Sequence, residues 1–365
     1  MEPLDASELS GELAIHFAEA GEPKRAIHYA KIAAAEAREG GAGTAAVHFF
    51  EIVVQNETDP LRRASATADL AKALHMDRQL TRSNPMLELA ATRLRRTGDE
   101  PTARRMEILR VEGLAENGET PVSDLIDRLI QVKAEARRAK DSEAVALALD
   151  GELFLRHKRG NVPRIRALLD EMTVVARSGP PEAACLSNAS LGLGVLFRDS
   201  EDGVARGERA VEIALEHGFK SHLLKAQCRL IAILAYSARL YLPASQKLIG
   251  EARAVAEGSG DRFVRCAIEA NVAAFQLDVG DLDEAGESFA RAVPLLSGGD
   301  VQRVSTNHYL NLAELALLRH DFGDAESRYR GVRDTFPTAP VPHFSNAVHA
   351  GLGLCALEQG RFSEA

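Results

Sequence analysis

The side chains most able to do chemistry in this sequence are its eleven histidines, its four cysteines and its glycine-rich turns. Gly192-Leu-Gly194 has part of the pattern of a phosphate-binding loop, and His222 with Cys228 contains the groups of a nucleophilic dyad. However, Gly192 lies inside an apolar helical run with no strand before it, and six residues along a helix place His222 and Cys228 on different faces. We therefore favour close helix packing and a buried structural cysteine.

Other signatures of catalysis or metal binding are absent from the sequence. It contains neither a GxxxxGK[ST] phosphate loop nor an HExxH zinc motif, and no serine occupies a nucleophile elbow. His16 and His28 lie twelve residues apart on different predicted helices, so they are not expected to share a metal ion. The sequence predicts no catalytic residue, no metal and no cofactor.

Charge and composition argue against further classes of function. The formal net charge is −9, so a basic nucleic-acid-binding surface is not expected. One group of arginines is interleaved with Glu100 and Glu107, which favours a solvated helix face; its members are Arg93, Arg95, Arg96, Arg104, Arg105 and Arg110. The acidic N-terminus does not resemble a signal peptide, and the longest uncharged apolar run, 230–238, is too short to cross a membrane. We therefore expect a cytoplasmic protein.

The elements that would position these side chains form a repeat. Four segments share a pattern of glycine (histidine in one), a polar residue, an apolar residue or proline, two mainly polar residues and alanine; they begin at Gly21, Gly280, His320 and Gly360. The first residue would end a helix in the left-handed conformation, and the alanine would mark the closest contact of two helices. The last three segments are 40 residues apart, and Gly160 lies 120 residues before Gly280, which predicts a period of about 40.

Apolar spacing places helices along the whole chain. The first helices of successive pairs are predicted at 61–77, 101–116, 142–158, 182–198, 220–238, 261–279, 301–319 and 343–359. The second helices are predicted at 85–97, 121–139, 163–177, 202–217, 242–257, 283–296 and 323–335, after N-terminal helices at about 7–20, 23–39 and 44–57. The predicted fold is all-α, a right-handed superhelical solenoid of antiparallel helix pairs. Residues 1–57 would form its N-terminal helices and residues 58–365 its repeats, truncated in the last repeat.

The turn pattern and the small and aromatic residues around it resemble the tetratricopeptide repeat (TPR). In the unit at 261–297 the family's packing positions hold Val272, Ala273, Ala285, Phe289 and Ala292. In the first unit they hold Leu13, Ala14, Phe17, Ala26 and Ala33. The period of about 40 exceeds the usual 34 residues, so we expect longer helices than in the common repeat.

A narrower resemblance connects residues 12–30 with the repeat region of large bacterial signal-transduction ATPases with numerous domains (STAND). These include LuxR-type regulators similar to the maltose-regulon activator. The segment Glu12-Leu-Ala-Ile-His-Phe-Ala-Glu-Ala-Gly-Glu-Pro-Lys-Arg-Ala-Ile-His-Tyr-Ala is similar to the stretch that follows their nucleotide-binding and winged-helix modules. The ATPase motifs and the helix-turn-helix of that family are absent from this sequence, so none of the family's functional residues is assigned here.

The candidate binding residues are polar side chains on otherwise apolar first helices. In a solenoid of helix pairs these helices line the concave face. Alignment of the units on their turns places there Arg105, Glu112, Asp150, His157, Asn188, Arg229, Tyr236, Asn307 and Glu314. Both solvation of an inner surface and binding of a partner are consistent with this pattern. Asn271 and Asn311 occupy a neighbouring position, where they can also bond between helices.

The final turn motif reaches Ala365, its packing alanine, without a second helix after it. We therefore expect a fragment of a longer protein in which the apolar side of Phe344, Val348, Leu352 and Cys355 has lost its cover. Self-association through this end is one predicted consequence.

These features predict a non-catalytic sensor or scaffold region of a bacterial multidomain regulator. It would bind a small ligand, a peptide or a protein partner on its concave face and so control an attached ATPase or DNA-binding output. It would contact neither nucleic acid nor a membrane directly. A free-standing adaptor for protein partners is the alternative, and an enzyme with an unrecognised helical site is a third class.

Overall fold

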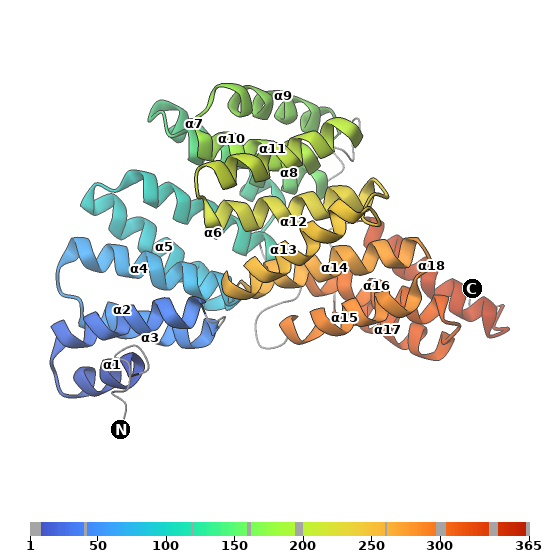
Figure 1. Cartoon of the computed structure of the whole chain (residues 1–365), viewed down its shortest axis with the longest axis horizontal. Coiled ribbons are helices and arrows are strands. Elements are labelled where there is room, and N and C mark those ends of the chain that lie inside the picture. Colours follow the sequence, from blue (N-terminus) through green and yellow to red (C-terminus); the bar gives the residue numbers. More distant parts are fainter. Residues whose placement is uncertain are drawn as a thin grey trace. The chain divides into compact units, whose positions relative to one another are not determined.

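The chain is built from antiparallel helices that follow one another in sequence (Figure 1). The computed structural model describes residues 9–39, 42–117, 120–158, 162–193, 200–259, 261–296, 304–335 and 342–362. Within these ranges there are eighteen helices and no strand. The predicted all-α fold of antiparallel helix pairs is therefore confirmed.

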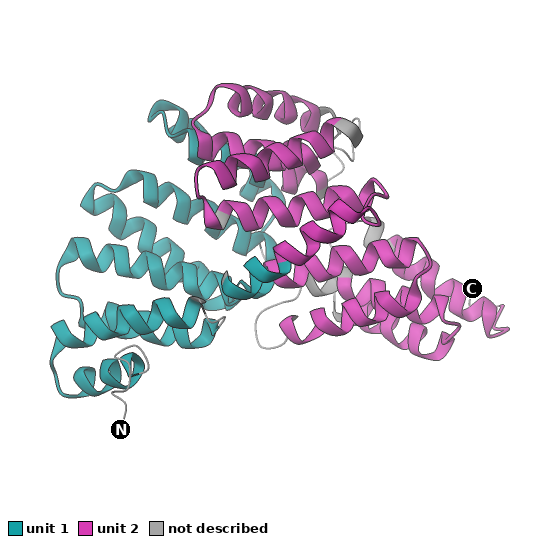
Figure 2. Cartoon of the chain, in the orientation of Figure 1, with its two compact units in different colours: residues 1–152, 253–263 teal, residues 153–252, 264–365 magenta. Residues whose placement is uncertain are grey.

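The helices are distributed over two compact units, coloured separately in Figure 2. Unit 1 comprises residues 1–152 with 253–263, and unit 2 comprises residues 153–252 with 264–365. The helices that begin in 1–152 are α1 (Ser10–Glu19), α2 (Pro23–Glu39), α3 (Gly43–Asn56), α4 (Pro60–Met76), α5 (Leu80–Thr97), α6 (Glu100–Asn117), α7 (Val122–Arg138) and α8 (Ser142–Lys158). The later helices are α9 (Val162–Ser178), α10 (Pro181–Leu193), α11 (Ser200–Glu216), α12 (Lys220–Tyr236), α13 (Pro243–Ser259), α14 (Arg262–Asp278), α15 (Leu282–Leu296), α16 (Val304–Leu318), α17 (Phe322–Thr335) and α18 (Pro342–Glu358). The boundary predicted at 57/58 separates the N-terminal helices from the repeats, and the division into two compact units does not test it. It stays a prediction.

In those turns between paired helices that the structure describes, one residue adopts the left-handed conformation. Gly280 has a φ of 82°, and its N–H donates to Leu277 O at 3.0 Å while Asp281 N–H donates to Gln276 O at 2.8 Å. These two bonds satisfy carbonyls that the helix end would otherwise leave unpaired. The same conformation recurs at Ala238, His320 and Gly360, which confirms the period of about 40 in this part of the chain. The turn predicted at Gly160 lies outside the described residues.

Proline marks the start of many helices. Pro60, Pro181, Pro243 and Pro342 are each the first residue of a helix, where the missing N–H costs nothing. Pro85 and Pro294 are exceptions, because each lies inside a helix. Pro85 does so because α5 begins at Leu80 rather than at 85. Leu80 is fully buried, so packing extends the helix in the N-terminal direction despite the proline.

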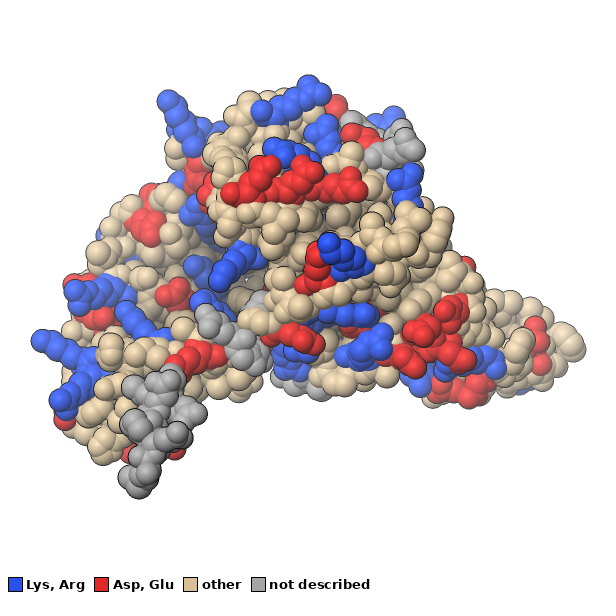
Figure 3. All heavy atoms as spheres, in the orientation of Figure 1, with Lys and Arg blue, Asp and Glu red and all other residues tan. Residues whose placement is uncertain are grey.

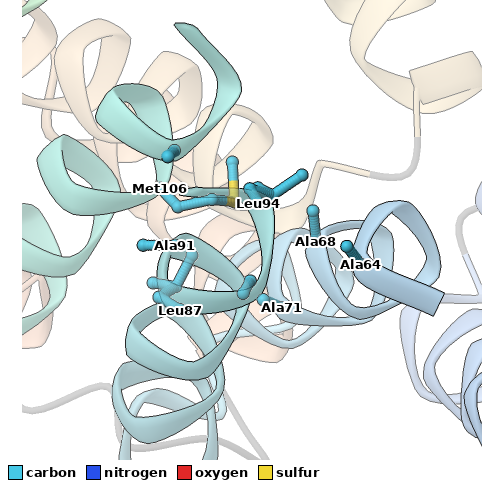
Figure 4. Packing of buried hydrophobic residues seen from close by; sticks show 9 residues of the cluster. Ala64, Ala68, Ala71, Leu87, Ala91, Leu94 and Met106 are labelled. Carbon is cyan, nitrogen blue, oxygen red and sulfur yellow. The ribbon is translucent and has the colours of Figure 1, made fainter. Parts of the chain in front are cut away.

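The core consists of alanines on one helix that face larger side chains on the next (Figure 4). Ala64, Ala68 and Ala71 of α4 lie against Leu87 and Leu94 of α5. Small residues let the two helices approach closely, and the leucines fill the space between them. The turn alanines serve the same purpose: Ala26, Ala285 and Ala325 are fully buried, as the repeat pattern predicts.

Gly192, which the sequence analysis singled out, and Gly351 are packing residues. A Cβ atom on Gly192 would lie 2.5 Å from Ile233 Cδ1, and one on Gly351 would overlap the ring of Tyr329. Both glycines lie inside helices, α10 and α18. Gly192 therefore allows close helix contact, in agreement with the interpretation favoured over a phosphate loop.

The face of α18 predicted to be uncovered is in fact covered. Val348 and Cys355 are buried and Leu352 is half-buried, because they pack against Ala313, Tyr329 and other residues of α16 and α17. The prediction assigned this side of α18 to a following helix that the sequence lacks. In the structure the same side contacts the preceding helix pair, α16 and α17. The side chain of Phe344 lies outside the described residues.

Candidate functional site

A row of polar contacts links each first helix of unit 1 to the next. His75 Nε2 of α4 lies 4.0 Å from Glu112 Oε2 of α6, and Arg78, in the turn after α4, pairs with Glu116 of α6. The second step joins α6 to the start of α8. There Arg104 Nη2 lies 2.9 Å from Asp141 Oδ2, and Arg105 pairs with Glu143; we call these four pairs the inter-repeat ladder.

The ladder includes two of the predicted site residues, Arg105 and Glu112. Partners in the ladder are 37 or 38 residues apart, close to the repeat period, so each pair joins roughly equivalent positions of consecutive units. The Arg105 pair remains partly accessible, with its side chains 30% and 26% exposed. The Glu143 hydrogen bond and charge offset burial and raise the pKa of Arg105, which stays a cation. These side chains can hold neighbouring repeats together and still meet solvent.

Two further predicted residues, Asn188 and Arg229, lie in a polar cluster of α10 to α12. Arg229 Nη1 donates to Ser190 Oγ at 2.7 Å. Asn188 is buried rather than placed on an open face: its amide donates to Ala184 O at 2.9 Å and accepts from Arg206 at 3.3 Å. A buried amide must find such partners, which explains its inward position.

The remaining predicted residues are dispersed over three helices. Tyr236, at the end of α12, is 66% exposed, and Tyr241 beyond it is 69% exposed. On α8, Asp150 is half-buried and His157 is exposed. Desolvation and the neighbouring Asp278 carboxylate raise the pKa of Glu314 on α16. Asn307 belongs to α16, but its side chain lies outside the described residues. The structure therefore groups some of these residues in pairs and does not gather them into one site.

Unit 2 contains a pocket of about 490 Å³ formed by α15, α16 and α17. Its lining is mainly apolar and consists of Gly286, Phe289, Ala290, Val293, Pro294, Leu312, Leu315 and Ala316. Phe289 is fully buried, whereas Val293 is 43% exposed and remains available for contact. This volume and polarity suit a side chain or a small apolar group.

The charged residues of this pocket are Arg319, Asp321, Asp324 and Arg328. Arg319 Nη2 donates to Leu282 O at 2.8 Å and to Asp283 Oδ1 at 3.2 Å. Arg328 Nε donates to Asp324 Oδ2 at 2.6 Å, and Asp321 caps α17 through Asp324 N–H. Because these arginines already have acidic or carbonyl partners, the apolar lining carries most of the free binding capacity.

Sequence reasoning did not find this pocket. Its lining comes largely from a second helix and from the ends of helices, whereas the predicted binding residues belong to first helices. The sequence feature that could have indicated the pocket is Val293-Pro294, an apolar pair next to the buried residues Phe289 and Ala292 of α15.

The floor of the pocket rests on a buried histidine. The rings of Phe289 and His308 meet edge to face, with centroids 5.2 Å apart. His308 is 1% exposed, and among the described residues its Nε2 has no hydrogen-bond partner. Burial lowers its pKa from 6.5 to about 4, so the imidazole is neutral at physiological pH. The floor is therefore uncharged.

The part of the chain that the structure describes offers no group of three or more histidine, cysteine, aspartate or glutamate side chains able to hold a metal ion. Cys185, Cys266 and Cys355 are buried free thiols, and burial raises the pKa of Cys185 to about 11. A thiol with a raised pKa is a poor nucleophile and a poor metal ligand. Across the described ranges, no helix is both long and apolar enough to cross a membrane.

Comparisons with known proteins give similarity at the level of fold. No protein-family model matches the sequence, and no curated protein matches it. A STAND protein with a tetratricopeptide repeat sensor from Pyrococcus horikoshii has a TM-score of 0.52 and 13% sequence identity. The similarity covers 90% of this chain and 51% of that chain, so this chain spans about half the length of the STAND protein. A Rap protein complexed with Competence and Sporulation Factor has a TM-score of 0.41 and 11% identity over 93% of this chain and 76% of that one. The helix pairs, the left-handed turns and the first of these similarities together show an all-α helical repeat fold of the TPR type.

Proposed function

We propose that this chain is a non-catalytic repeat scaffold that binds a peptide or protein partner. The observation that carries the proposal is the pocket of α15, α16 and α17, where an apolar lining has one accessible wall at Val293 and paired charges beside it. A partner would insert an apolar side chain there and make polar contacts with the charged groups. A small amphipathic effector with an apolar body has the same chemistry.

In its finer form, the proposal is that the chain is the sensor arm of a bacterial multidomain regulator. The fold shared with a STAND protein that has a TPR sensor supports this form, as does the resemblance of residues 12–30. Binding would control an attached ATPase or DNA-binding output by favouring one of two conformations. The alternative is a free-standing adaptor, which would use the same pocket without such an output.

The test is a selection of pocket-binding peptides from a random displayed library, followed by measurement of their affinities by fluorescence anisotropy. Val293→Glu places a charge on the accessible apolar wall, so selected peptides should bind this variant about tenfold or more weakly, a loss of about 1.4 kcal/mol. Leu215→Glu is the matched control, because Leu215 is exposed on α11 and does not line the pocket. Failure to enrich any peptide, or equal affinities for the wild type and the Val293→Glu variant, would show that the pocket is not the binding site.

A further inference from the structure

Four arginines of the α4–α5 pair differ from the other arginines around them. Arg62 and Arg63 lie in the first turns of α4, and Arg93 and Arg96 lie near the end of α5. The two helices pack antiparallel through Ala64, Leu94 and their neighbours, so the start of α4 meets the end of α5. In Figure 3, lysine and arginine side chains are interspersed with acidic ones along the left edge of the view, which belongs to unit 1.

The arginines that neighbour these four in sequence have acidic partners. Arg95 of α5 lies 3.7 Å from Glu107 and 3.9 Å from Glu100, and Arg110 of α6 lies 2.9 Å from Glu88. In the described ranges, no carboxylate lies within ion-pair distance of Arg62, Arg63, Arg93 or Arg96. The arginine group predicted as one solvated face therefore separates into paired arginines and an unpaired set, which Arg62 and Arg63 join from α4.

Arg93 is held in place next to another cation. Its Nη1 donates to Thr67 Oγ1 at 2.7 Å, and the Thr67 hydroxyl donates to Arg63 O at 2.6 Å. Arg63 precedes Thr67 by one helical turn, so the two residues share a face of α4. Burial and the neighbouring Arg63 charge lower the pKa of Arg93. The Arg93 guanidinium is therefore held at Thr67, one helical turn from Arg63 on the same face of α4, and among the described residues neither arginine has a carboxylate within ion-pair distance.

The carboxylates nearest in sequence to these four arginines have other partners. Asp59 accepts Arg62 N–H at 2.8 Å as the cap of α4, and Glu57 accepts Asp59 N–H at 3.0 Å. Asp99 accepts Thr102 N–H at 3.1 Å, where it caps α6. Asp69 lies 4.0 Å from Lys72. These carboxylates stabilise helix ends or other cations, so the positive charge at Arg63 and Arg93 remains available to a ligand.

We propose that Arg63 and Arg93, flanked by Arg62 and Arg96, form a binding site for a phosphoryl group. A guanidinium presents a planar fork of donors that matches phosphate oxygens, and Arg93 is already oriented by Thr67. A phosphate monoester carries a charge of about −1.5 to −2 at neutral pH and can neutralise both cations, which a single carboxylate cannot do. The site belongs to unit 1 and the pocket to unit 2, so this inference does not depend on the proposed function.

The experiment titrates the full chain with inorganic phosphate at constant ionic strength, with chloride as the reference anion, and follows binding by calorimetry and by the shift in Tm. Saturable binding with a Kd of about 1 mM or tighter is expected, together with a rise in Tm, because a ligand of the folded state stabilises it. Arg63→Gln and the double variant Arg63→Gln/Arg93→Gln should weaken binding by about tenfold or more. Arg63 is exposed, so the single variant removes the charge without disturbing the core.

Arg95→Gln is the matched control, since it removes the same charge from the same helix at an arginine with acidic partners; its affinity should stay close to that of the wild type. A phosphoserine peptide and its unphosphorylated twin distinguish the source of the phosphoryl group. Tighter binding of the phosphopeptide than of phosphate indicates a phosphorylated segment, and equal binding indicates a free anion. The proposal is overturned if neither probe binds the wild type, or if Arg63→Gln/Arg93→Gln binds as well as the wild type.

Discussion

At the scale of single residues, His308 shows how the fold imposes a protonation state. The ring is 1% exposed and meets Phe289 at the floor of the pocket, and burial lowers its pKa to about 4. The unfolded chain takes up a proton on this histidine as the pH falls below its ordinary pKa of 6.5, whereas the folded chain does not until about pH 4. The neutral ring therefore favours the folded state above pH 6.5, and this contribution is lost as the pH falls toward 4.

We predict that His308→Leu removes this pH dependence. Between about pH 6.5 and pH 4 the wild type should lose on the order of 3 kcal/mol of unfolding free energy relative to the variant, at 1.36 kcal/mol per pKa unit. Urea unfolding at several pH values in this range measures the difference. His217→Leu is the control, because an exposed imidazole meets water in both states. Parallel pH profiles for the wild type and the His308→Leu variant would contradict the prediction.

At the scale of elements, the turn alanine sets the distance between paired helices. Ala285 of α15 is fully buried in a cluster with Ala273, Leu277, Phe289 and Leu315. The space beside its methyl group is occupied on every side, so a longer side chain would force the two helices apart.

Ala285→Leu is accordingly expected to cost about 1–3 kcal/mol of unfolding free energy, because it overpacks this contact. Ala254→Leu provides the matched comparison, since Ala254 is exposed on α13 and its larger side chain meets solvent. Thermal unfolding of both variants measures the difference. A Tm for Ala285→Leu equal to that of the wild type would mean that the contact can relax.

Most of the elements could be predicted from the sequence because helix starts and turns carry local signals. Proline at Pro60 and Pro243, and the turn residues Gly280 and Gly360, act within a few residues of themselves. The early start of α5 could not be predicted, because it follows from the burial of Leu80 against other helices.

The candidate site was less predictable than the helices. Alignment on the turns predicted Arg105 and Glu112 as residues of one concave face, and the structure shows both in the inter-repeat ladder, whose partners are separated by about one repeat period. It placed Asn188 on an open face, because the polarity of a residue does not reveal whether its partners are water or backbone carbonyls. The pocket depends on three helices whose relative positions have no short-range signal.

At the scale of the whole molecule, the inter-repeat ladder couples neighbouring helix pairs within unit 1. Arg104 and Asp141 are both nearly buried, with Arg104 Nε and Nη2 both bonded to the same carboxylate oxygen at 3.1 and 2.9 Å. Removing one partner leaves a buried charge without compensation, which is far more costly than the pair is worth. In a repeat architecture the loss of stability should remain within the adjacent helix pairs.

We predict that Arg104→Met destabilises the region by about 3–5 kcal/mol. Amide hydrogen exchange should accelerate in α6, α7 and α8 and stay unchanged in α16 and α17. Arg105→Met is the control at the neighbouring, partly exposed pair, where a loss of about 1 kcal/mol or less is expected. A uniform acceleration of amide exchange throughout the chain would show that the helix pairs do not open independently.

The ladder also has a mechanical consequence for unit 1. It joins α6 to α8 through two adjacent ion pairs of different accessibility, the buried Arg104–Asp141 and the partly exposed Arg105–Glu143. At physiological ionic strength the Debye length is about 8 Å, so salt screens the exposed pair and largely spares the buried one. The elastic stiffness of this connection therefore has a salt-resistant part and a salt-sensitive part. We therefore expect ionic strength to change how stiffly α6 and α8 are connected, because salt weakens the exposed pair and largely spares the buried one.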